Sequence, residues 1–302
     1  MLEETLTGLE IKPDGQYLDG TFGRGGHGRA LLSRLGKQGR LFAFDKDPDA
    51  IAEGQKLAAQ EPRFSIVQGS FADVDHLLGD LGLVEFAGFD GILLDLGVSS
   101  PQLDDPDRGF SFRAEGPLDM RMNPAHGVSA AEWLAGADEN EITRVLREFG
   151  EERQARRIAR SIVTSRQQKP IATTAQLAQL IKSTIGRPQD KKHPATKSFQ
   201  AIRIKINNEL ADLATGLDAI IKQLRPGGRL AVISFHSLED RIVKRAFKKA
   251  AQAGPVYRKL PPVPGARAVL RLVAKAQFPS EEEISLNPRC RSAVLRVAEK
   301  LS

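Results

Sequence analysis

The sequence predicts an α/β fold in which a parallel, doubly wound sheet is interrupted by a long all-helical segment. In the first hundred residues, short apolar runs alternate with helical patterns, as they do in sheets built from βα units. A helical stretch of about 90 residues follows, after which Leu230–Ser234 resumes the sheet. A glycine-rich turn after the first strand places a candidate ligand site at the carboxyl edge of that sheet.

Each expected strand is an apolar run that ends at a turn or a polar residue. Before the helical segment, these runs are Tyr17–Asp19, Arg40–Phe44, Phe64–Val67 and Gly91–Leu96. The fourth is almost wholly apolar, as expected for a parallel strand that is buried on both faces. A turn at Leu224–Arg229 (LRPGGR) ends a helix and leads into the fifth strand.

The expected helices have apolar residues at helical spacing. The first begins with Ala30–Leu35, and one long helix covers Lys197–Leu224 before the fifth strand. Between the sheet segments, the pattern predicts helices over Ser129–Gly136, Asn140–Phe149, Glu151–Arg166 and Thr174–Ile185, the last with an N-cap at Thr173. The predicted domains are a discontinuous sheet domain, 1–103 with 198–302, and an inserted basic helical domain, 104–197.

The glycine-rich turn after the first strand indicates a nucleotide site. Gly23, Gly25 and Gly28 have the G-x-G-x-x-G spacing that lets the backbone approach a ligand closely. About 20 residues beyond the turn, Asp45 follows the second strand, where a carboxylate can bind ribose hydroxyls. The order of strand, turn, helix and acid predicts that a nucleotide binds here.

Asp19 bears on which nucleotide binds. It ends the first strand, four residues before Gly23. A carboxylate there would repel the pyrophosphate of a dinucleotide and attract the amine of S-adenosylmethionine. The helix, turn and strand that end at Ser234 also resemble the approach to the fifth strand of class I methyltransferases. Both features favour S-adenosylmethionine over NAD as the cofactor.

Composition limits the class of protein. With 302 residues, of which 41% are hydrophobic, the chain can bury a large core. Its single cysteine excludes internal disulfides, and the first residues (MLEETLTGLE) do not have the pattern of a signal peptide. No apolar run approaches the ~20 residues of a membrane span, so we expect a cytoplasmic protein. The five histidines are scattered without the spacing of metal ligands, so no metal site is expected.

Positive charge is concentrated in the helical segment. Residues 141–205 contain fifteen Lys and Arg against five Asp and Glu, a net charge of +10, whereas the whole chain carries +6. Such an excess is typical of surfaces that bind a phosphate backbone. Four arginines at i, i+3, i+4 and i+7 share one face of an expected helix, namely Arg153, Arg156, Arg157 and Arg160. Four further clusters flank that face: Arg166/Lys169, Lys182/Arg187, Lys191/Lys192 and Arg203/Lys205.

A series of motifs along the chain resembles one family. The motifs are Asp19–His27 (DGTFGRGGH), Asp95–Asp104 (DLGVSSPQLD), Arg108–Phe112 (RGFSF), Gly116–Met122 (GPLDMRM), Phe149–Glu152 (FGEE), His193–Gln200 (HPATKSFQ), Ser234–Asp240 (SFHSLED) and Asn287–Ser292 (NPRCRS). Together they resemble the bacterial small-subunit ribosomal RNA methyltransferase H family, over nearly the whole chain. The resemblance implies a class I, Rossmann-like S-adenosylmethionine methyltransferase sheet with an inserted all-helical domain. It also implies N4-methylation of a decoding-centre cytidine in 16S rRNA, within the small ribosomal subunit.

The resemblance assigns roles to individual residues. It implies cofactor contacts from Gly25, Gly26, His27, Asp45, Phe71, Asp95 and Gln102, to which the charge argument adds Asp19. Two of these have a second interpretation: Phe71 as a core aromatic under a loop, and Asp95 as a helix-capping or turn acid. The strand ends supply the catalytic candidates Asp95, His236 and Glu239, with Asp240 beside them. For His236, a core role is an equal alternative.

Methyl transfer to N4 of cytosine explains why acceptors are expected there. The N4 lone pair is delocalised into the ring, so positioning must provide most of the acceleration. An acceptor near the amine would hold one N–H and later accept a proton. A target base in structured RNA would also have to be splayed into the pocket.

Three other functions remain open from the sequence. A NAD-dependent oxidoreductase would explain the glycine turn and Asp45, but not Asp19 or the basic segment. A non-catalytic RNA-binding or assembly protein would explain the basic segment, but not the cofactor site. A methyltransferase that acts on tRNA or DNA is the closest rival, because positive charge recognises phosphate rather than sequence.

Overall fold

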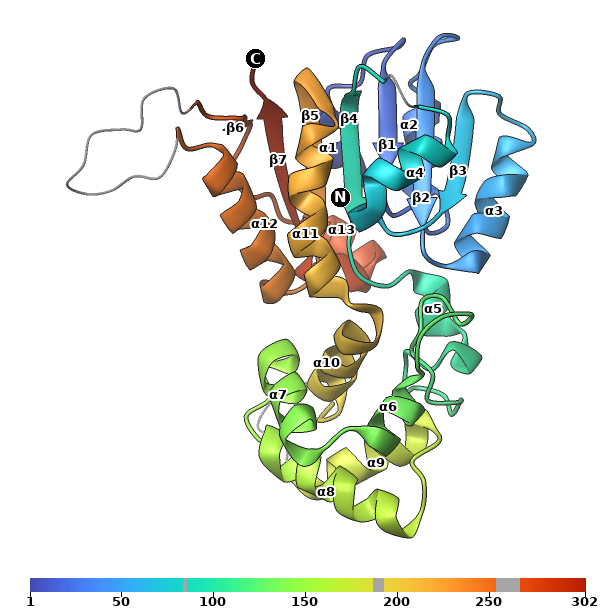
Figure 1. The fold of residues 1–302 in the computed structure, drawn as a ribbon, viewed down its shortest axis with the longest axis vertical. Helices are drawn as coiled ribbons and strands as arrows, with labels where there is room; N and C mark the ends of the chain where they lie inside the picture. Colours follow the sequence, from blue (N-terminus) through green and yellow to red (C-terminus); the bar gives the residue numbers. More distant parts are fainter. Residues whose placement is uncertain (84–85, 187–192, 254–266) are drawn as a thin grey trace, which may run out of the picture. The chain divides into compact units, whose positions relative to one another are not determined.

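The chain forms two structural units, and the computed structural model describes residues 1–83, 86–186, 193–253 and 267–302. The first unit consists of Met1–Gly97 and Leu210–Ser302, and the second of Val98–Glu209 (Figure 1). The sequence-based division placed these boundaries after residues 103 and 197. In the structure, helices α5 (Ser100–Asp104) and α10 (Thr196–Asn207) lie in the second unit. No helix in the described ranges is long and apolar enough to cross a membrane.

A seven-stranded sheet in the order β3-β2-β1-β4-β5-β7-β6 forms the centre of the first unit (Figure 1). Its parallel strands are β1 (Gln16–Asp19), β2 (Arg40–Asp45), β3 (Phe64–Gln68), β4 (Phe89–Asp95) and β5 (Leu224–Ser234). This order confirms the predicted doubly wound sheet, with the fourth strand between the first and the fifth. The carboxyl ends of these strands share one edge, where such sheets bind ligands.

Two antiparallel strands complete the sheet and were not predicted. β7 (Val294–Lys300) pairs with β5, and β6 (Leu270–Leu272) pairs with β7. With three residues, β6 is too short to give a periodic signal, and β7 mixes apolar with charged residues. The predicted turn around Gly227 lies within β5, where the pairing with β4 shifts its register.

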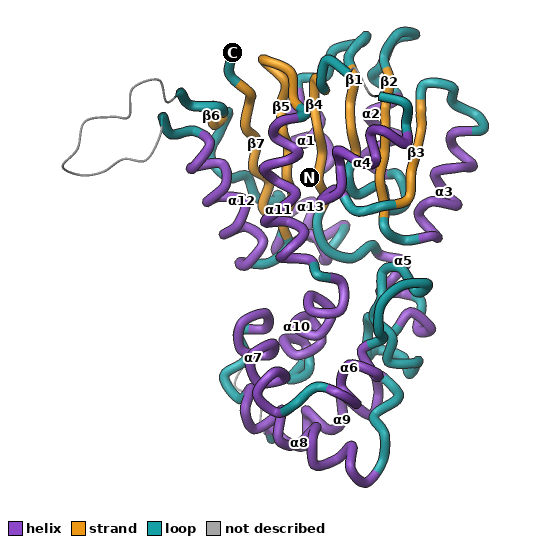
Figure 2. The backbone as a smooth tube through the Cα atoms, viewed as in Figure 1, coloured by secondary structure: helices purple, strands orange, loops and turns teal. Residues whose placement is uncertain are grey.

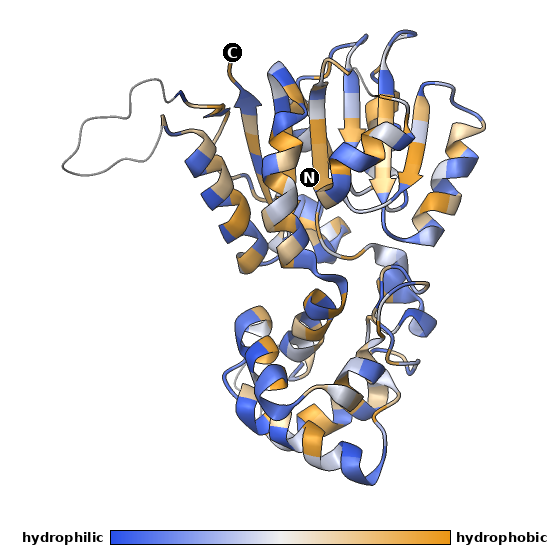
Figure 3. Cartoon of the chain, in the orientation of Figure 1, coloured by the Kyte–Doolittle hydropathy of each residue, from blue (hydrophilic) through white to orange (hydrophobic). Residues whose placement is uncertain are grey.

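Helices cover both faces of the sheet (Figure 2). One face carries α4 (Val74–Asp80), α11 (Glu209–Lys222) and α12 (Ser237–Ala250), and the other carries α1 (Leu2–Leu9), α2 (Gly26–Leu32), α3 (Pro48–Ala58) and α13 (Glu281–Leu286). Successive strand residues alternate between the two cores, so that Leu18 packs in the first and Tyr17 in the second. Strands buried in this way are largely apolar, as Figure 3 shows for β4.

The second unit has a helical core of its own. Besides α5 and α10, its helices are α6 (Ala130–Gly136), α7 (Glu139–Gly150), α8 (Ala155–Gln168) and α9 (Thr174–Ile185). Helix α9 begins at the predicted cap, because the Thr173 hydroxyl accepts a hydrogen bond from the Gln176 N–H at 3.3 Å. In return, the Gln176 amide oxygen accepts from the Thr173 N–H at 3.2 Å.

Three helix predictions are wrong at a boundary, and two of these errors have a backbone cause. The single helix expected over 197–224 is two helices, α10 and α11, because Asn208 adopts a left-handed conformation (φ 56°) between them. The helix expected from Glu151 begins at Ala155, because Glu151 itself is the left-handed C-cap of α7 (φ 48°). Arg153 therefore precedes α8 instead of sharing its face. Helix α2 starts at Gly26, earlier than expected.

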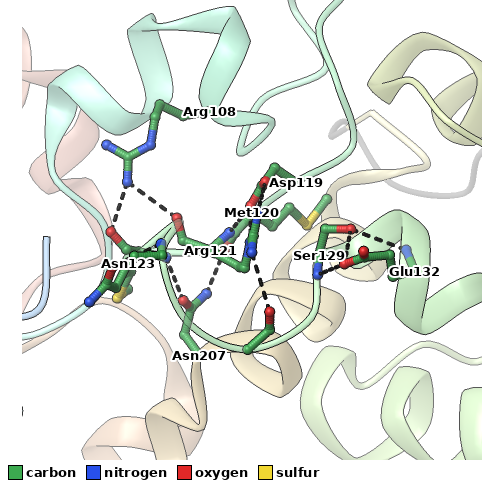
Figure 4. A network of polar contacts seen from close by, with 11 residues as sticks. Arg108, Asp119, Met120, Arg121, Asn123, Ser129, Glu132 and Asn207 are labelled. Atoms are coloured by element: carbon green, nitrogen blue, oxygen red, sulfur yellow. Dashed lines mark hydrogen bonds and ion pairs between the residues drawn. The ribbon is translucent and has the colours of Figure 1, made fainter. Parts of the chain in front are cut away.

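A network of polar contacts fixes the loop between α5 and α6 (Figure 4). The Arg121 guanidinium donates two hydrogen bonds to the Asp119 carboxylate, at 2.8 and 2.6 Å. Asn207 of α10 accepts from the Met122 N–H and donates to the Met120 carbonyl, both at 2.7 Å. Arg108 also donates to the Met122 carbonyl at 2.9 Å. The motif at 116–122 thus holds this loop against α10.

Candidate active site

The glycine-rich turn between β1 and α2 leaves backbone open at the start of the helix. Gly25 has φ 73°, and its N–H donates to the Phe22 carbonyl at 2.8 Å. A Cβ at Gly25 would lie 2.5 Å from the buried Phe22 ring, so a side chain there would collide. At Gly26, by contrast, a Cβ would meet nothing within 4 Å in the described chain. A ligand can therefore approach the Gly26 backbone directly.

Asp45, at the end of β2, holds the turn in place. Its Oδ2 accepts a hydrogen bond from the Gly23 N–H at 2.7 Å, and its Oδ1 accepts from the Asp47 N–H at 2.9 Å. Burial raises the pKa of Asp45, and these two N–H groups oppose that rise. Each carboxylate oxygen can still accept a further hydrogen bond, so Asp45 can also bind ribose hydroxyls.

Asp19, His27 and Asp95 form a cluster where β1, α2 and β4 meet. His27 Nδ1 lies 3.3 Å from Asp95 Oδ2. The buried Asp19 carboxylate accepts a hydrogen bond from the Thr21 N–H at 3.1 Å. The Thr21 hydroxyl in turn accepts from the Asp95 N–H at 2.6 Å and so ties the turn to the end of β4. Thr21 was not identified from the sequence.

Burial and like charges perturb the ionisation of this cluster. Burial raises the pKa of Asp19 to about 7; His27 and the Thr21 N–H oppose this, while the charges of Asp95 and Asp45 add to it. Burial alone would lower the pKa of His27, but the hydrogen bond to Asp95 and its negative charge outweigh that effect and raise it. The two carboxylates beside His27, with the charge of Asp45 nearby, make a site suited to a cation.

Two buried atoms of the cluster have unused hydrogen-bonding capacity. Asp95 Oδ1 and His27 Nε2 are buried and have no hydrogen-bond partner among the described residues. Buried polar atoms are normally hydrogen-bonded. A ligand that forms hydrogen bonds with these two atoms would therefore remove the free-energy cost of leaving them unsatisfied. One oxygen of Asp95 thus faces His27, and the other is a buried acceptor that has no partner among the described residues.

A second network links the loops that follow β2 and β3. Asp212, near the start of α11, forms an ion pair with Lys46 and accepts a hydrogen bond from the Ser70 hydroxyl at 2.9 Å. Lys46 directly follows Asp45, and Ser70 directly precedes Phe71; Asp45 and Phe71 are both predicted cofactor residues. These contacts join residues 166 and 142 positions apart, so no local pattern could have indicated Asp212.

Phe71 is a core residue by its side chain. It begins a short 3-10 turn, η1 (Phe71–Asp73), and belongs to the same hydrophobic core as α11. Its ring lies against Gly216, where a Cβ would come within 2.8 Å of it. The Phe71 ring is therefore a core aromatic, as the second interpretation of the sequence expected. A cofactor contact by Phe71 would involve its backbone or the edge of the ring.

Gln102 caps a helix in the second unit. Its amide oxygen accepts a hydrogen bond from the Ser99 N–H at 2.8 Å, and its own N–H donates to the Ser99 hydroxyl at 3.5 Å. This capping box starts α5. These two contacts of Gln102 are local, and the cofactor contact implied by the resemblance stays a prediction.

His236 and Glu239 form the turn that leads from β5 into α12. Glu239 is buried, and its Oε2 accepts hydrogen bonds from the N–H groups of Phe235 and His236, at 2.8 and 3.3 Å. His236 Nδ1 accepts from the Glu239 N–H at 3.4 Å, and Nε2 lies 3.2 Å from Glu239 Oε1. Ile233 of β5 pairs with Asp95, which brings this turn to the sheet edge where Asp95 lies. The turn gives both residues a structural role, and their catalytic roles stay predictions.

The predicted basic surface is only partly available. Arg156, Arg157 and Arg160 are exposed on α8, and Arg153 is exposed just before it. Three other predicted basic residues have partners inside the second unit, and Lys205 is one of them, 3.5 Å from Glu141. The Arg166 guanidinium donates to the carbonyls of Leu134 and Ala137 at the end of α6, and Arg203 makes a two-point ion pair with Glu209, at 2.8 and 2.7 Å. Arg187, Lys191 and Lys192 lie outside the described residues.

The family model and the named relatives agree with each other. A family model described as the MraW methylase family matches residues 1–301. Two proteins named ribosomal RNA small subunit methyltransferase H are similar along nearly the whole chain. The one from Stenotrophomonas maltophilia (strain K279a) is 56% identical over 98% of this chain and 91% of the relative. The one from Xanthomonas euvesicatoria pv. vesicatoria (strain 85-10) is 57% identical over 99% and 87%. The solved structure of an rRNA methylase from Streptococcus thermophilus is 11% identical, with a TM-score of 0.42 over 99% of this chain and 93% of that chain.

Proposed function

The chain belongs to the MraW methylase family, and on that premise we propose that it uses S-adenosylmethionine to methylate the exocyclic N4 of a cytidine in 16S rRNA. The names of relatives at 56% and 57% identity support a small-subunit rRNA substrate. Membership in a methylase family leaves the oxidoreductase and the non-catalytic interpretations without support. We propose that it acts in the cytoplasm on rRNA within the small subunit, which the names of these relatives support.

The acidic cluster beside the glycine-rich turn carries the cofactor assignment. Asp45, Asp19 and Asp95 end three adjacent strands, β2, β1 and β4. S-adenosylmethionine has an ammonium and a sulfonium, which such a cluster attracts, whereas a dinucleotide would place its pyrophosphate against these carboxylates. When bound, the cofactor supplies an electrophilic methyl group. The residues present therefore fit this cofactor.

Each part of the cofactor has a proposed partner. The Asp45 carboxylate binds the ribose hydroxyls, and Asp19 binds the ammonium. The backbone of Gly25, Gly26 and His27 holds the methionine end. Two observations support this: the Gly26 backbone is unobstructed, and a Cβ at Gly28, two residues further along the same turn, would lie 3.5 Å from Asp19 Oδ2. Phe71 borders the adenine.

Asp95 is the proposed group that positions the target amine. Its Oδ2 faces His27, and its Oδ1 is a buried acceptor without a partner among the described residues, which a hydrogen bond from N4 would satisfy. As N4 gains the methyl group its remaining N–H becomes more acidic, and a carboxylate already bonded to it can accept that proton. His236, at the end of β5, would line the same rim, and Glu239 would hold His236 in place through the capping turn.

The affinity for S-adenosylmethionine should rise with pH and level off above about 8. Because the pKa of Asp19 is raised to about 7, this carboxyl is protonated in much of the free protein below that pH. Binding the ammonium favours the ionised form, so below pH 7 binding must release a proton and is weakened by up to about tenfold per pH unit. Calorimetry from pH 5.5 to 8.5 measures this profile. In Asp19→Asn the rise should be absent; a wild-type profile without a rise would contradict the ammonium assignment.

Asp212→Ala should weaken cofactor binding about fivefold and leave the turnover at saturating cofactor unchanged. The substitution removes an ion pair and a hydrogen bond that fix the loops beside Asp45 and Phe71, each contributing about 1 kcal/mol or less. Asp218→Ala is the matched control, since Asp218 is on the same helix, is exposed, and lies 3.6 Å from Lys249. Equal dissociation constants for the two variants would show that Asp212 does not position the site.

Charge reversal on α8 should weaken the interaction with RNA selectively. We propose that Arg156, Arg157 and Arg160, with Arg153 beside them, contact phosphates of the rRNA. Arg156→Glu/Arg160→Glu should raise the KM for rRNA about tenfold or more and reduce its dependence on salt, with cofactor affinity unchanged. Lys37→Glu/Lys56→Glu is the control, because both lysines are exposed on the first unit. A loss of cofactor affinity without a loss of RNA affinity would mean that the face is structural.

A methyl-transfer assay with several acceptors tests the proposed function. The protein is incubated with methyl-labelled S-adenosylmethionine and, in parallel, with small subunits, protein-free 16S rRNA, tRNA or DNA. We expect label in small-subunit rRNA, and digestion to nucleosides should place it on N4 of cytidine. Label in tRNA or DNA but not in rRNA would favour the rival substrate classes.

A further inference from the structure

Helix α12 has a basic face that the proposed function does not use. Its exposed residues include five with positive charge, namely Arg241, Lys244, Arg245, Lys248 and Lys249, while Val243 and Phe247 are buried against the sheet. The first four basic residues are spaced i, i+3, i+4 and i+7, so they share one side of the helix. Two opposed faces, one apolar and one basic, thus run along α12.

The acidic residues of α12 do not balance this face. Glu239 is buried in the capping turn, and the Asp240 carboxylate accepts two hydrogen bonds from Arg296 of β7, at 2.6 and 3.0 Å. Lys249 lies 3.6 Å from Asp218. In the described part of the chain, no carboxylate is within ion-pair distance of Lys244, Arg245 or Lys248.

Helix stability does not explain the arrangement. Cations in the last turn interact favourably with the helix dipole, which accounts for Lys248 and Lys249 but not for Lys244 and Arg245 in the middle of α12. Lys244 and Lys248, like Arg245 and Lys249, are like charges at i,i+4, which destabilise an isolated helix. The face therefore costs stability, and a polyanionic partner would offset that cost.

The position of α12 indicates which polyanion. The helix begins at the turn of His236 and Glu239, beside the end of β4 with Asp95, and runs back along the sheet (Figure 1). From Arg241 to Lys248 the face extends about 10 Å, by the rise of an α-helix. A base splayed toward Asp95 needs its flanking backbone held close to that edge. The cations of α12 are regularly spaced along the helix, which starts near the sheet edge at Asp95 and extends away from that edge.

We propose that this α12 face docks the sugar–phosphate backbone of the rRNA next to the target cytidine. The inference rests on the proposed rRNA substrate and adds to it an RNA contact on the sheet unit itself, separate from α8. Lys and Arg at helical spacing fit phosphates without reading sequence, so the face contributes affinity and register rather than base choice.

Direct RNA binding by charge variants tests the proposal. The variant Lys244→Gln/Arg245→Gln removes two charges while glutamine keeps a similar helix propensity. Its binding to a protein-free rRNA fragment with the target cytidine is measured over a series of salt concentrations. We expect affinity to fall about tenfold and the slope of log K against log salt to decrease by about 1.5. Cofactor affinity should not change, and the melting temperature should not fall; a small rise is expected because like charges at i,i+4 are removed.

Two controls separate local docking from net charge and from folding. Lys37→Gln/Lys56→Gln removes the same charge elsewhere on the first unit and should bind RNA nearly as the wild type does. Lys244→Arg/Arg245→Lys keeps the charges of α12 and should also bind normally. The proposal would be overturned if Lys244→Gln/Arg245→Gln had the RNA affinity and salt slope of the wild type. It would also be overturned if Lys37→Gln/Lys56→Gln lost as much RNA affinity as Lys244→Gln/Arg245→Gln.

The same measurements distinguish this proposal from the proposed function. If the wild type methylates no rRNA but its RNA binding still depends on Lys244 and Arg245, the docking face stands and the proposed reaction fails. If it methylates rRNA and binding does not depend on them, the reaction stands and the docking face fails. A loss of binding to intact small subunits, with unchanged binding to protein-free rRNA, would assign the face to a ribosomal protein and so contradict the proposal.

Discussion

Asp95→Ala should lower the single-turnover rate of methyl transfer by 10²-fold or more at saturating cofactor and RNA. The substitution removes the unpartnered oxygen proposed to hold N4 and accept its proton, together with the partner of His27. The hydrogen bond from the residue 95 N–H to the Thr21 hydroxyl uses the backbone, so the tie between β4 and the glycine turn should survive. Rapid-quench assays on small-subunit rRNA measure the rate.

Asp95→Asn separates positioning from proton acceptance. Asparagine can still accept a hydrogen bond from N4 but is not a base. A rate close to that of Asp95→Ala would assign proton acceptance to Asp95, and an intermediate rate would assign mainly positioning. A wild-type rate in the alanine variant would remove Asp95 from the catalytic group and favour His236.

Asp45→Ala should weaken S-adenosylmethionine binding by about 1–3 kcal/mol, or about 5- to 150-fold, as expected for the loss of a charge-assisted acceptor. The structure adds a second effect, because Asp45 also accepts hydrogen bonds from the N–H groups of Gly23 and Asp47. The melting temperature should therefore fall as well. Calorimetry with S-adenosylmethionine and with its demethylated product measures the affinity.

Asp14→Ala is the matched control for Asp45→Ala. Asp14 is an exposed aspartate in the loop before β1, at the edge of the sheet opposite the cofactor cluster. Its replacement should leave cofactor affinity unchanged. Equal affinities for Asp45→Ala and the wild type would refute the ribose assignment, whatever the change in melting temperature.

Local sequence patterns predicted the parallel strands and most helices of the second unit, because each depends on its own residues. β4 is apolar on both faces, and α9 has a capping box within four residues. The break between α10 and α11 was missed because it depends on one residue, Asn208, in a left-handed conformation within otherwise continuous helical periodicity. For the same reason, Arg153 was placed on a helix that begins only at Ala155.

The residues of the candidate site also fall into those that the sequence could predict and those that it could not. Asp19, Asp45 and Asp95 could be predicted because each ends a strand, and parallel topology brings strand ends together. Thr21 and Asp212 could not, since their partners lie 74 and more than 140 residues away. Arg166 and Arg203 counted as docking charges in the sequence, whereas their carbonyl and carboxylate partners inside the second unit become visible only in the fold.

Nucleoside mass spectrometry of small-subunit rRNA tests the central claim most directly. The rRNA is taken from cells without the gene, and from the same cells complemented with the wild type or with Asp95→Ala. The account predicts that N4-methylated cytidine is absent without the gene, is restored by the wild type, and is not restored by the variant. Methylation that depends on the gene but lies on a ring carbon, on N3 or on a ribose oxygen would contradict it.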